Sequence, residues 1–195
     1  MIGVKSRLHT VTRVLRRMKR MAVDRRGASA LEFALIVPTL IVIYVAVAEI
    51  GNALTIYRRA SQVASTAADL TAQVRSLSKS DIGDIQAAAS SILTPYPTSP
   101  LTIVLTSVVA DENNRGKVDW SCANQGGAHS TGSSYQVPTG LTEADSSVIV
   151  AEVKYHFTPL LGLTSLFSLG SFDMARTFYT RPRRSLKVAK TDNGC

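Results

Sequence analysis

Residues 28–51 read ASALEFALIVPTLIVIYVAVAEIG, and this stretch decides how the chain begins to fold. From Phe33 to Ala48 there are sixteen consecutive residues without charge, and only Glu32 and Glu49 interrupt the apolar character of the whole stretch. At about 1.5 Å per residue, a helix of this length spans roughly 36 Å, enough to cross a hydrocarbon core of about 30 Å. The stretch therefore predicts a transmembrane helix over residues 28–51.

The charge of the chain is concentrated ahead of this helix. Of 22 Lys and Arg in 195 residues, nine lie within residues 1–26, which contain a single acid, Asp24. The remaining 13 basic and 13 acidic residues cancel, so the net charge of +8 comes from the head. The positive-inside rule predicts that residues 1–27 form a cytoplasmic leader and that the chain after the helix lies outside the cytoplasm. Because topology explains the charge, we expect no nucleic-acid partner.

The junction between head and helix, residues 27–33, reads GASALEF. Glu32 is unexpected there, because a carboxylate at mid-bilayer costs about 2 to 3 kcal/mol. It lies at the interface, or in a first helical turn where the helix dipole favours an acid, or it follows a cleavage site. If a protease cut between Gly27 and Ala28, Glu32 would be the fifth residue of the mature chain and would neutralise the new α-amino group of a neighbouring subunit. Gly27 readily adopts the extended backbone that a protease requires.

These residues resemble the N-terminus of the TadE/TadF family, the minor pilins (pseudopilins) of Tad-type (Flp) type IV pilus systems. In that family a basic leader ends in Gly, the fifth residue after it is Glu followed by an aromatic, and a proline interrupts the helix early. Gly27, Glu32, Phe33 and Pro38 match in order and spacing. The resemblance covers about residues 25 to 60, with a weaker one near residues 146–180.

The resemblance implies cleavage after Gly27 by a prepilin peptidase, which would recognise Gly27, Ala28, Glu32 and Phe33. It also implies a pilin-like fold and a role in assembling a pilus used in adhesion. The expected partners are the peptidase, other pilins and pseudopilins, pilus assembly platform proteins and membrane lipid. The expected location is the bacterial inner membrane, as a single-pass protein with a cytoplasmic N-terminus and a periplasmic C-terminal domain, or the extracellular pilus itself.

Three alternatives stay open at this point. Pro38 either serves packing alone or loosens the helix so that a subunit can leave the bilayer. Residues 46–48, AVA, look like a signal-peptidase site, in which case the chain is a secreted binding protein that begins at Glu49. An uncut, membrane-anchored periplasmic domain is the third interpretation.

Beyond Gly51, apolar residues recur at alternating spacings of four and three, which predicts that the helix continues with a heptad seam. The seam consists of Ile56, Ala60, Val63, Ala67, Leu70, Val74 and Leu77. It packs either on this protein's own sheet or between subunits in a filament core. A second short helix is expected to begin at Ser80 and to end before Pro95, within a helical region over residues 52–94, with Ile82, Ile85, Ala89 and Ile92 on one side.

Residues 95–100, PYPTSP, predict a rigid linker, after which the composition shifts to strand formers. A β-rich domain is expected over residues 95–180 and a loose basic tail over 181–195. The expected strands are Leu101–Val109, Gly116–Cys122, Ser147–Phe157 and Phe172–Tyr179, with a hairpin turn at residues 111–114 and a long, functional or mobile loop over 122–140. The apolar connector 159–170 either packs in the core or contacts a partner. The predicted fold class is α+β: a long N-terminal helix packed on a small antiparallel sheet.

The chain has two cysteines, Cys122 and Cys195, in an oxidising compartment if the topology holds. They form an intramolecular disulfide, closing a loop of about 74 residues and adding roughly 4 kcal/mol, or remain free or pair between chains. His9, His129 and His156 look isolated, and no spacing indicates a metal site, a cofactor or a catalytic triad. We therefore expect a non-enzymatic protein.

Overall fold

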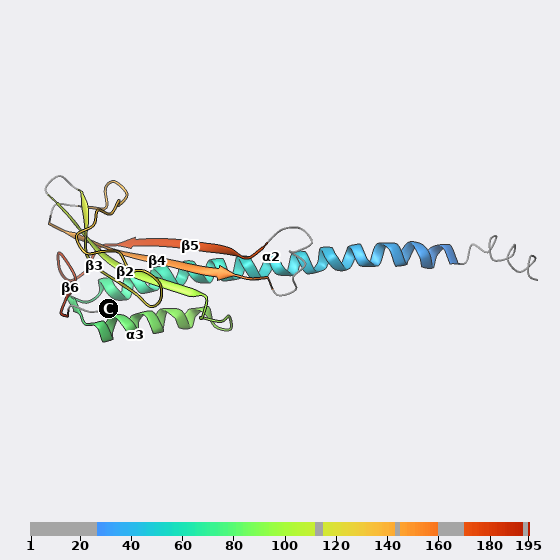
Figure 1. The fold of residues 1–195 in the computed structure, drawn as a ribbon, viewed down its shortest axis with the longest axis horizontal. Coiled ribbons are helices and arrows are strands. Elements are labelled where there is room, and N and C mark those ends of the chain that lie inside the picture. The colour runs from blue at the N-terminus through green and yellow to red at the C-terminus, as the bar shows by residue number, and fades with distance from the viewer. Residues whose placement is uncertain (1–26, 112–114, 143–144, 160–169, 193–194) are drawn as a thin grey trace, which may run out of the picture. The chain divides into compact units, whose positions relative to one another are not determined.

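The computed structural model describes residues 27–111, 115–142, 145–159, 170–192 and 195, in which a long apolar helix is followed by an antiparallel sheet (Figure 1). The predicted α+β class is confirmed. The chain divides into two compact units, Met1–Ala48 and Glu49–Cys195. The leader that ends at residue 27 and the connector 159–170 lie mostly outside the described residues.

Helix α2 spans Ala28–Ala72 and belongs to both units. Its first part is rich in Ala, Leu, Ile and Val and contains Pro38, through which the helix is continuous. None of its residues from 28 to 48 is buried. The helix ends at Ala72, so the prediction that it continues to Val74 and Leu77 is wrong for those two residues.

The sheet of the C-terminal unit has four antiparallel strands in the order β3-β2-β4-β5. The strands are β2 Leu101–Ala110, β3 Gly116–Ala123, β4 Ser147–Phe157 and β5 Phe172–Thr180. All four predicted strands are confirmed to within one residue. The turn at residues 112–114 lies outside the described part, but Asp111 N–H donates to the Arg115 carbonyl at 2.9 Å, which closes the β2–β3 hairpin.

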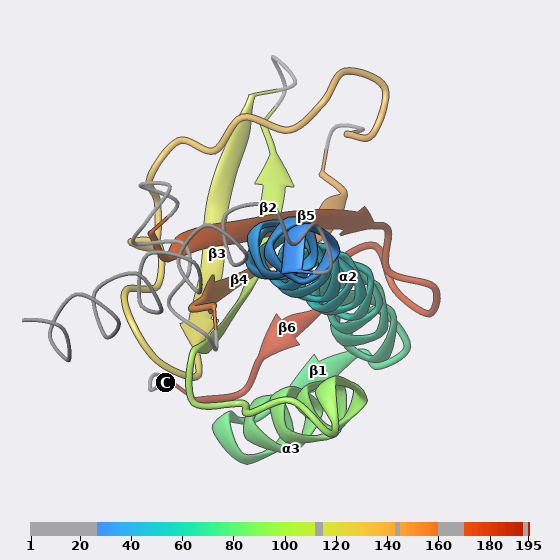
Figure 2. The same cartoon turned by 90° about the vertical axis from the view of Figure 1, so that its right-hand side faces the viewer.

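One face of the sheet is covered by two helices, as Figure 2 shows. The C-terminal part of α2 lies on the β5 side, where the Arg176 guanidinium sits 3.8 Å from the Tyr57 ring centroid. Helix α3, Lys79–Ser90, lies on the β3 side, where Gln86 Nε2 donates to the Cys122 carbonyl at 3.4 Å. Side chains from both helices and from alternate strand positions form the main core, which includes Ile56, Val63, Ile82, Leu93, Leu101, Ile103, Leu105, Ile149 and Val153.

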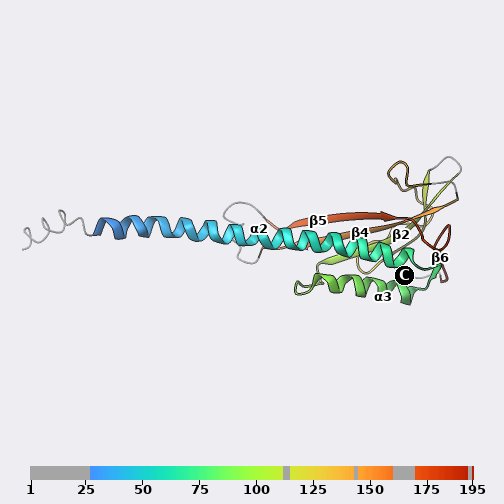
Figure 3. The same ribbon diagram turned by 180° about the vertical axis from the view of Figure 1, so that it is seen from behind.

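Helix α3 runs beside the C-terminal part of α2 (Figure 3) and begins at Lys79, one residue before the predicted start at Ser80. Its N-cap is Ser78 rather than Ser80, because the Ser78 hydroxyl accepts from Asp81 N–H while the Asp81 carboxylate accepts from Ser78 N–H. This reciprocal pair satisfies two backbone donors that would otherwise have no partner. A short 3₁₀ helix, Ser91–Leu93, follows directly, so Ile92 lies outside α3 although it packs against the core.

The tail after residue 180 is not loose, contrary to the prediction. Its Ala189–Lys190 segment forms strand β6, parallel to β1 at Ser76–Leu77. Val188 is fully buried, and its carbonyl accepts from Trp120 Nε1 at 2.9 Å. The tail is therefore part of the folded domain, although the basic residues within it made it look like a solvated extension.

Candidate functional site

The junction predicted as a cleavage site lies at the beginning of α2. The helix starts at Ala28, directly after Gly27. Gly27 is exposed, and a Cβ atom built on it would meet nothing within 4 Å. Ala28, Glu32 and Phe33 are exposed as well, Phe33 to 68%. Within the part of the chain that the structure describes, nothing covers the Gly27–Ala28 peptide bond.

Glu32 is the fifth residue of α2, and the first turn of the helix contains no acid. The stabilisation of a carboxylate by the helix dipole falls off within the first turn. The interpretation that Glu32 belongs to the first turn is therefore wrong. Two interpretations of Glu32 remain: it lies at the membrane interface, or it pairs with another charged group.

Helix α2 is the one helix among the described residues that is long and apolar enough to cross a membrane. Its most apolar 18-residue window has no buried residue, so this window does not pack in the core of the domain as the later residues of α2 do. Large exposed side chains surround it, including Leu31, Leu35, Ile36, Leu40, Ile41, Ile43, Tyr44 and Val47. Such a surface is consistent with single-pass membrane anchoring.

The residues of the predicted seam differ in burial and in the element that contains them. Ile56, Ala60, Val63 and Ala67 are buried under the sheet and belong to the main core. Leu70 and Val74 are only half-buried, and Leu77 is buried from strand β1. The alanines allow α2 to approach the sheet closely, so the seam packs on this protein's own domain.

Residues 27–69, from Gly27 through the buried part of α2, match the family model described as TadE-like protein. This segment is TadE-like. The match bears out the resemblance drawn from the junction and the apolar helix, and it extends past the exposed apolar stretch into the buried part of α2. The weaker resemblance near residues 146–180 lies outside the matched segment. No curated protein and no solved structure matches the chain.

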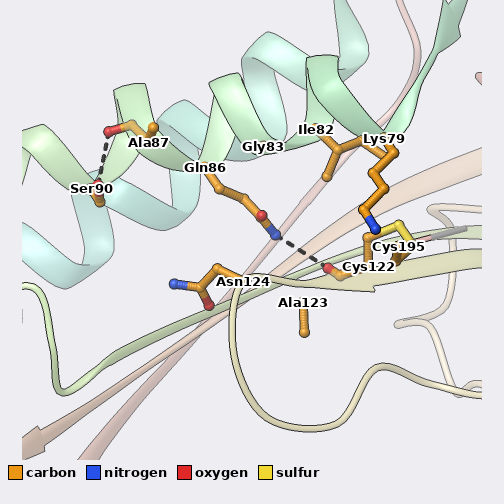
Figure 4. A pocket seen from close by; sticks show the side chains of 10 residues that line it. All are labelled: Lys79, Ile82, Gly83, Gln86, Ala87, Ser90, Cys122, Ala123, Asn124 and Cys195. Atoms are coloured by element: carbon orange, nitrogen blue, oxygen red, sulfur yellow. Dashed lines mark hydrogen bonds between the residues drawn. A yellow bond between two sulfur atoms is a disulfide. The ribbon is translucent and has the colours of Figure 1, made fainter.

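In the C-terminal unit, Cys122 and Cys195 form a disulfide, with Cα atoms 5.4 Å apart. The bond joins the end of the tail to the edge strand β3. It lies at one end of a groove between α3 and β3, which Gln86, Gly83 and Asn124 help to line (Figure 4). Gln86 is buried and donates across the groove to the carbonyls of Ile103 and Cys122, so its amide links helix to sheet.

The histidines predicted to be isolated have acidic partners where the structure describes them, and His9 lies outside that part. His129 Nε2 lies 2.5 Å from Glu152 Oε2, and Tyr135 donates to the other oxygen of Glu152 at 2.9 Å. Burial and the Glu152 carboxylate raise the pKa of Tyr135, which stays a neutral donor. These contacts join the loop after β3 to the outer face of the sheet, so the loop packs on the folded domain.

The second histidine contact lies further along β4, on the same outer face of the sheet, and involves β5. Asp173 of β5 accepts from Lys154 Nζ at 2.7 Å and lies 2.7 Å from His156 Nδ1. The Lys154 hydrogen bond, followed by the His156 hydrogen bond, lowers the pKa of Asp173. All three side chains are solvent-exposed, so the cluster is a surface ion pair network of modest strength.

Sequence reasoning missed both histidine contacts because each joins residues far apart in the chain. One signal was available for the first of them. Glu152 is the first charged residue of β4, directly after the buried apolar run Val148–Ala151, and it is only half-buried, so a polar partner was to be expected. Within the described residues, no group of three or more His, Cys, Asp or Glu side chains is arranged to hold a metal ion.

Proposed function

We propose that this protein is a minor pilin, or pseudopilin, of a Tad-type (Flp) type IV pilus system. In this proposal a prepilin peptidase cleaves the chain after Gly27. The mature subunit then initiates, caps or regulates the pilus through its apolar helix. The observation that carries the proposal is the TadE-like match, which begins at Gly27 and covers the whole apolar stretch.

Two features of the junction support processing there. The Gly27–Ala28 bond is not covered by any described residue, and a single exposed carboxylate, Glu32, stands five residues into the helix. In a bilayer, this carboxylate gains a favourable partner if it faces the α-amino group of a neighbouring processed subunit. The same segment would then serve the peptidase first and the assembly step afterwards.

The proposed topology is that of a single-pass inner-membrane protein with a cytoplasmic leader and a periplasmic domain. The nine basic residues ahead of the apolar stretch support this orientation. Other pilins, pseudopilins and assembly platform proteins are the proposed partners, along with membrane lipid. The protein has no catalytic role or cofactor in this proposal.

A secreted protein that begins at Glu49 is the competing interpretation. Cleavage there would divide the TadE-like segment, residues 27–69, into two pieces. It would also separate the domain from residues 28–48, which carry most of the large exposed apolar side chains of α2. Neither consequence suits a protein whose family signature spans both parts.

The test is the N-terminus and intact mass of the full chain recovered from membranes of cells with and without the prepilin peptidase. Ala28 as first residue, seen only when the peptidase is present, is the expected result. Glu49 as first residue would identify a secreted protein, and an intact leader in both strains would identify a plain membrane anchor.

A matched pair of variants tests the assembly role. Glu32→Ala removes the carboxylate at the start of the apolar stretch, whereas Glu49→Ala removes the one at its other end. We expect piliation to fall in the first variant and to persist in the second, with both proteins present in the membrane at equal level. Full piliation in Glu32→Ala cells would rule out the proposed pairing of this carboxylate.

A further inference from the structure

The two edge strands of the sheet, β3 and β5, differ in whether their outward N–H and C=O groups have hydrogen-bond partners. At the β3 edge, the loop after β3 supplies partners. Val118 N–H donates to the Ser133 carbonyl at 2.9 Å, and the Val118 carbonyl accepts from Gly132 N–H at 2.7 Å. The Gly116 carbonyl accepts from Tyr135 N–H at 2.9 Å. The loop after β3 therefore folds back along the edge of its own strand, and little backbone remains for another chain to pair with.

The opposite edge, β5, is open within the described part of the chain. Nine consecutive residues, Phe172–Thr180, pair with β4 without a register shift. In an antiparallel pair, alternate residues turn their N–H and C=O groups away from the partner strand. These outward groups of β5 have no backbone partner among the residues that the structure describes.

Strand β5 also lacks the devices that normally protect an edge. It contains no proline, no lysine and no bulge, although these are the common means of preventing strand pairing. Its two charged side chains are engaged elsewhere: Arg176 lies over the Tyr57 ring, and Asp173 pairs with Lys154 and His156. An unprotected edge of nine residues is a template for an added strand.

Apolar surface lies beside this edge. Phe172 and Phe178 are 49% and 41% exposed, although their partners on β4, Phe157 and Ala151, belong to the main core. An apolar groove of about 560 Å³ runs between α2 and the first half of β5. It is lined by Ile50, Ala53, Leu54, Tyr57, Phe172 and Met174, with Asp173 and Ala175. A strand added to β5 would place alternate side chains over these residues.

We propose that the β5 edge binds an extended segment of a different protein chain by β-strand addition, with apolar side chains at alternate positions filling the α2–β5 groove. Backbone hydrogen bonds would supply the affinity, and the groove would supply the preference for apolar side chains. This inference goes beyond the pilin role and does not depend on cleavage after Gly27. It assigns to the domain a peptide-binding edge in addition to its membrane helix.

A second copy of this chain does not suit the same edge. Two β5 edges in one continuous sheet pair antiparallel, about a two-fold axis perpendicular to the sheet. Such an axis reverses the direction of residues 49–72 of α2, which lie alongside β5 (Figure 1). Subunits that share one orientation in an assembly cannot pair through two β5 edges, and we take the occupant to be an extended segment of another protein.

The first experiment measures amide hydrogen exchange in the full chain in detergent micelles. Alternate β5 amides should exchange at least ~10-fold faster than the amides of Val118 and Tyr135, because only the latter have partners at their edge. Equal protection of all β5 amides would overturn the proposal, because the edge would then be covered already.

The second experiment identifies the occupant by photo-crosslinking in living cells. The photoreactive residue benzoylphenylalanine replaces Phe172 or Phe178 in the full chain, and Lys117, an exposed residue on the covered edge, serves as the control position. Mass spectrometry then maps the attachment site on the captured chain. Formation of the Cys122–Cys195 disulfide in each variant verifies that the domain has folded.

The expected result is that Phe172 and Phe178 positions attach to one short segment of one other protein, and that Lys117 does not. Because the two positions are six residues apart, their attachment sites should also lie about six residues apart in a paired strand. Crosslinks only between copies of this chain, only to lipid, or at unrelated places on many proteins would overturn the proposal, as would no crosslink.

Discussion

The two halves of α2 are built from different residues and meet different surroundings. Residues 28–48 carry large apolar side chains that are exposed, such as Leu40 at 55%. Residues 56–72 carry mainly alanines on the buried face, and Ala60 and Ala67 are fully buried. Large side chains suit contact with acyl chains, whereas small ones let a helix approach a sheet closely. The apolar side chains of α2 therefore change from large to small where the helix changes from exposed to buried.

The largest expected change in stability comes from removing the Cys122–Cys195 disulfide, which lies in the domain half of the molecule. The double variant Cys122→Ser, Cys195→Ser should lower the free energy of unfolding by about 2–4 kcal/mol, because the unfolded chain regains the freedom of a long loop. Thermal unfolding of the full chain in detergent measures this loss. Membrane extraction of the same variant should not change, since residues 28–48 are untouched.

If the double variant unfolded at the same temperature as the wild type, the disulfide would not hold the tail in place. The tail hydrogen bonds from Arg183 to the Ala72 carbonyl and from Trp120 to the Val188 carbonyl would then suffice. Reducing the wild type with dithiothreitol is the matched control and should reproduce the result of the variant.

The second-largest expected effect concerns the exposed apolar half of α2, residues 28–48. Leu40→Arg should oppose membrane insertion by about 2.5–3.5 kcal/mol, because a guanidinium near the centre of the apolar stretch 28–51 is costly in lipid. The fraction of protein that resists carbonate extraction measures this change. Gln62→Arg, on an exposed position of the domain half, is the matched control and should have no effect. Equal extraction of both variants would show that residues 28–48 do not lie in a bilayer.

The third effect tests the buried alanines. Ala67→Leu should destabilise the domain by about 1–3 kcal/mol, since a fully buried position has no space for three more carbons. Ala48→Leu makes the same change on the exposed half and should leave the unfolding temperature unaltered. A domain that accepts both substitutions equally would contradict close packing of α2 on the sheet.

The comparison also explains what the sequence could and could not predict. The apolar stretch and the four strands depend on local sequence patterns, so both could be predicted. The bounds of each strand were predicted to within one residue. The predicted seam extended too far because the spacing of apolar residues does not show whether each one lies in a helix or in a strand. Leu77 fits the heptad, yet it is buried from β1 after the helix has ended.

The tail and the loop after β3 could not be predicted, because their partners are remote in the chain. Ala189 N–H donates to the Arg75 carbonyl, and His129 contacts Glu152. Local composition made the tail look solvated and the loop look mobile. The junction at Gly27 has the opposite character, since its residues lie within seven consecutive positions and the match to the TadE-like family includes them all.

The smallest effect concerns how the helices begin. Helix α2 starts without an acid in its first turn, whereas α3 starts with the Ser78–Asp81 capping pair. Ser78→Ala should lower stability by about 1 kcal/mol, because Asp81 N–H loses its acceptor. The unfolding temperature of the full chain at pH 7 measures this loss. Ser80→Ala, on an exposed neighbouring position that makes no cap, is the control and should unfold at the wild-type temperature.

The same capping pair makes the stability of α3 depend on pH. The hydrogen bond from Ser78 N–H lowers the pKa of Asp81 below its ordinary value of 3.8. A carboxylate with a depressed folded-state pKa contributes stability that is fully present above its unfolded value and is lost as the pH falls through its folded value. Stability should therefore fall more steeply below pH 3.8 in the wild type than in Asp81→Asn, which has no charge to lose. Parallel curves for the two proteins, from thermal melts at pH 7 and about pH 3, would mean that the Asp81 charge does not stabilise α3, and that the cap depends on the Ser78 hydroxyl alone.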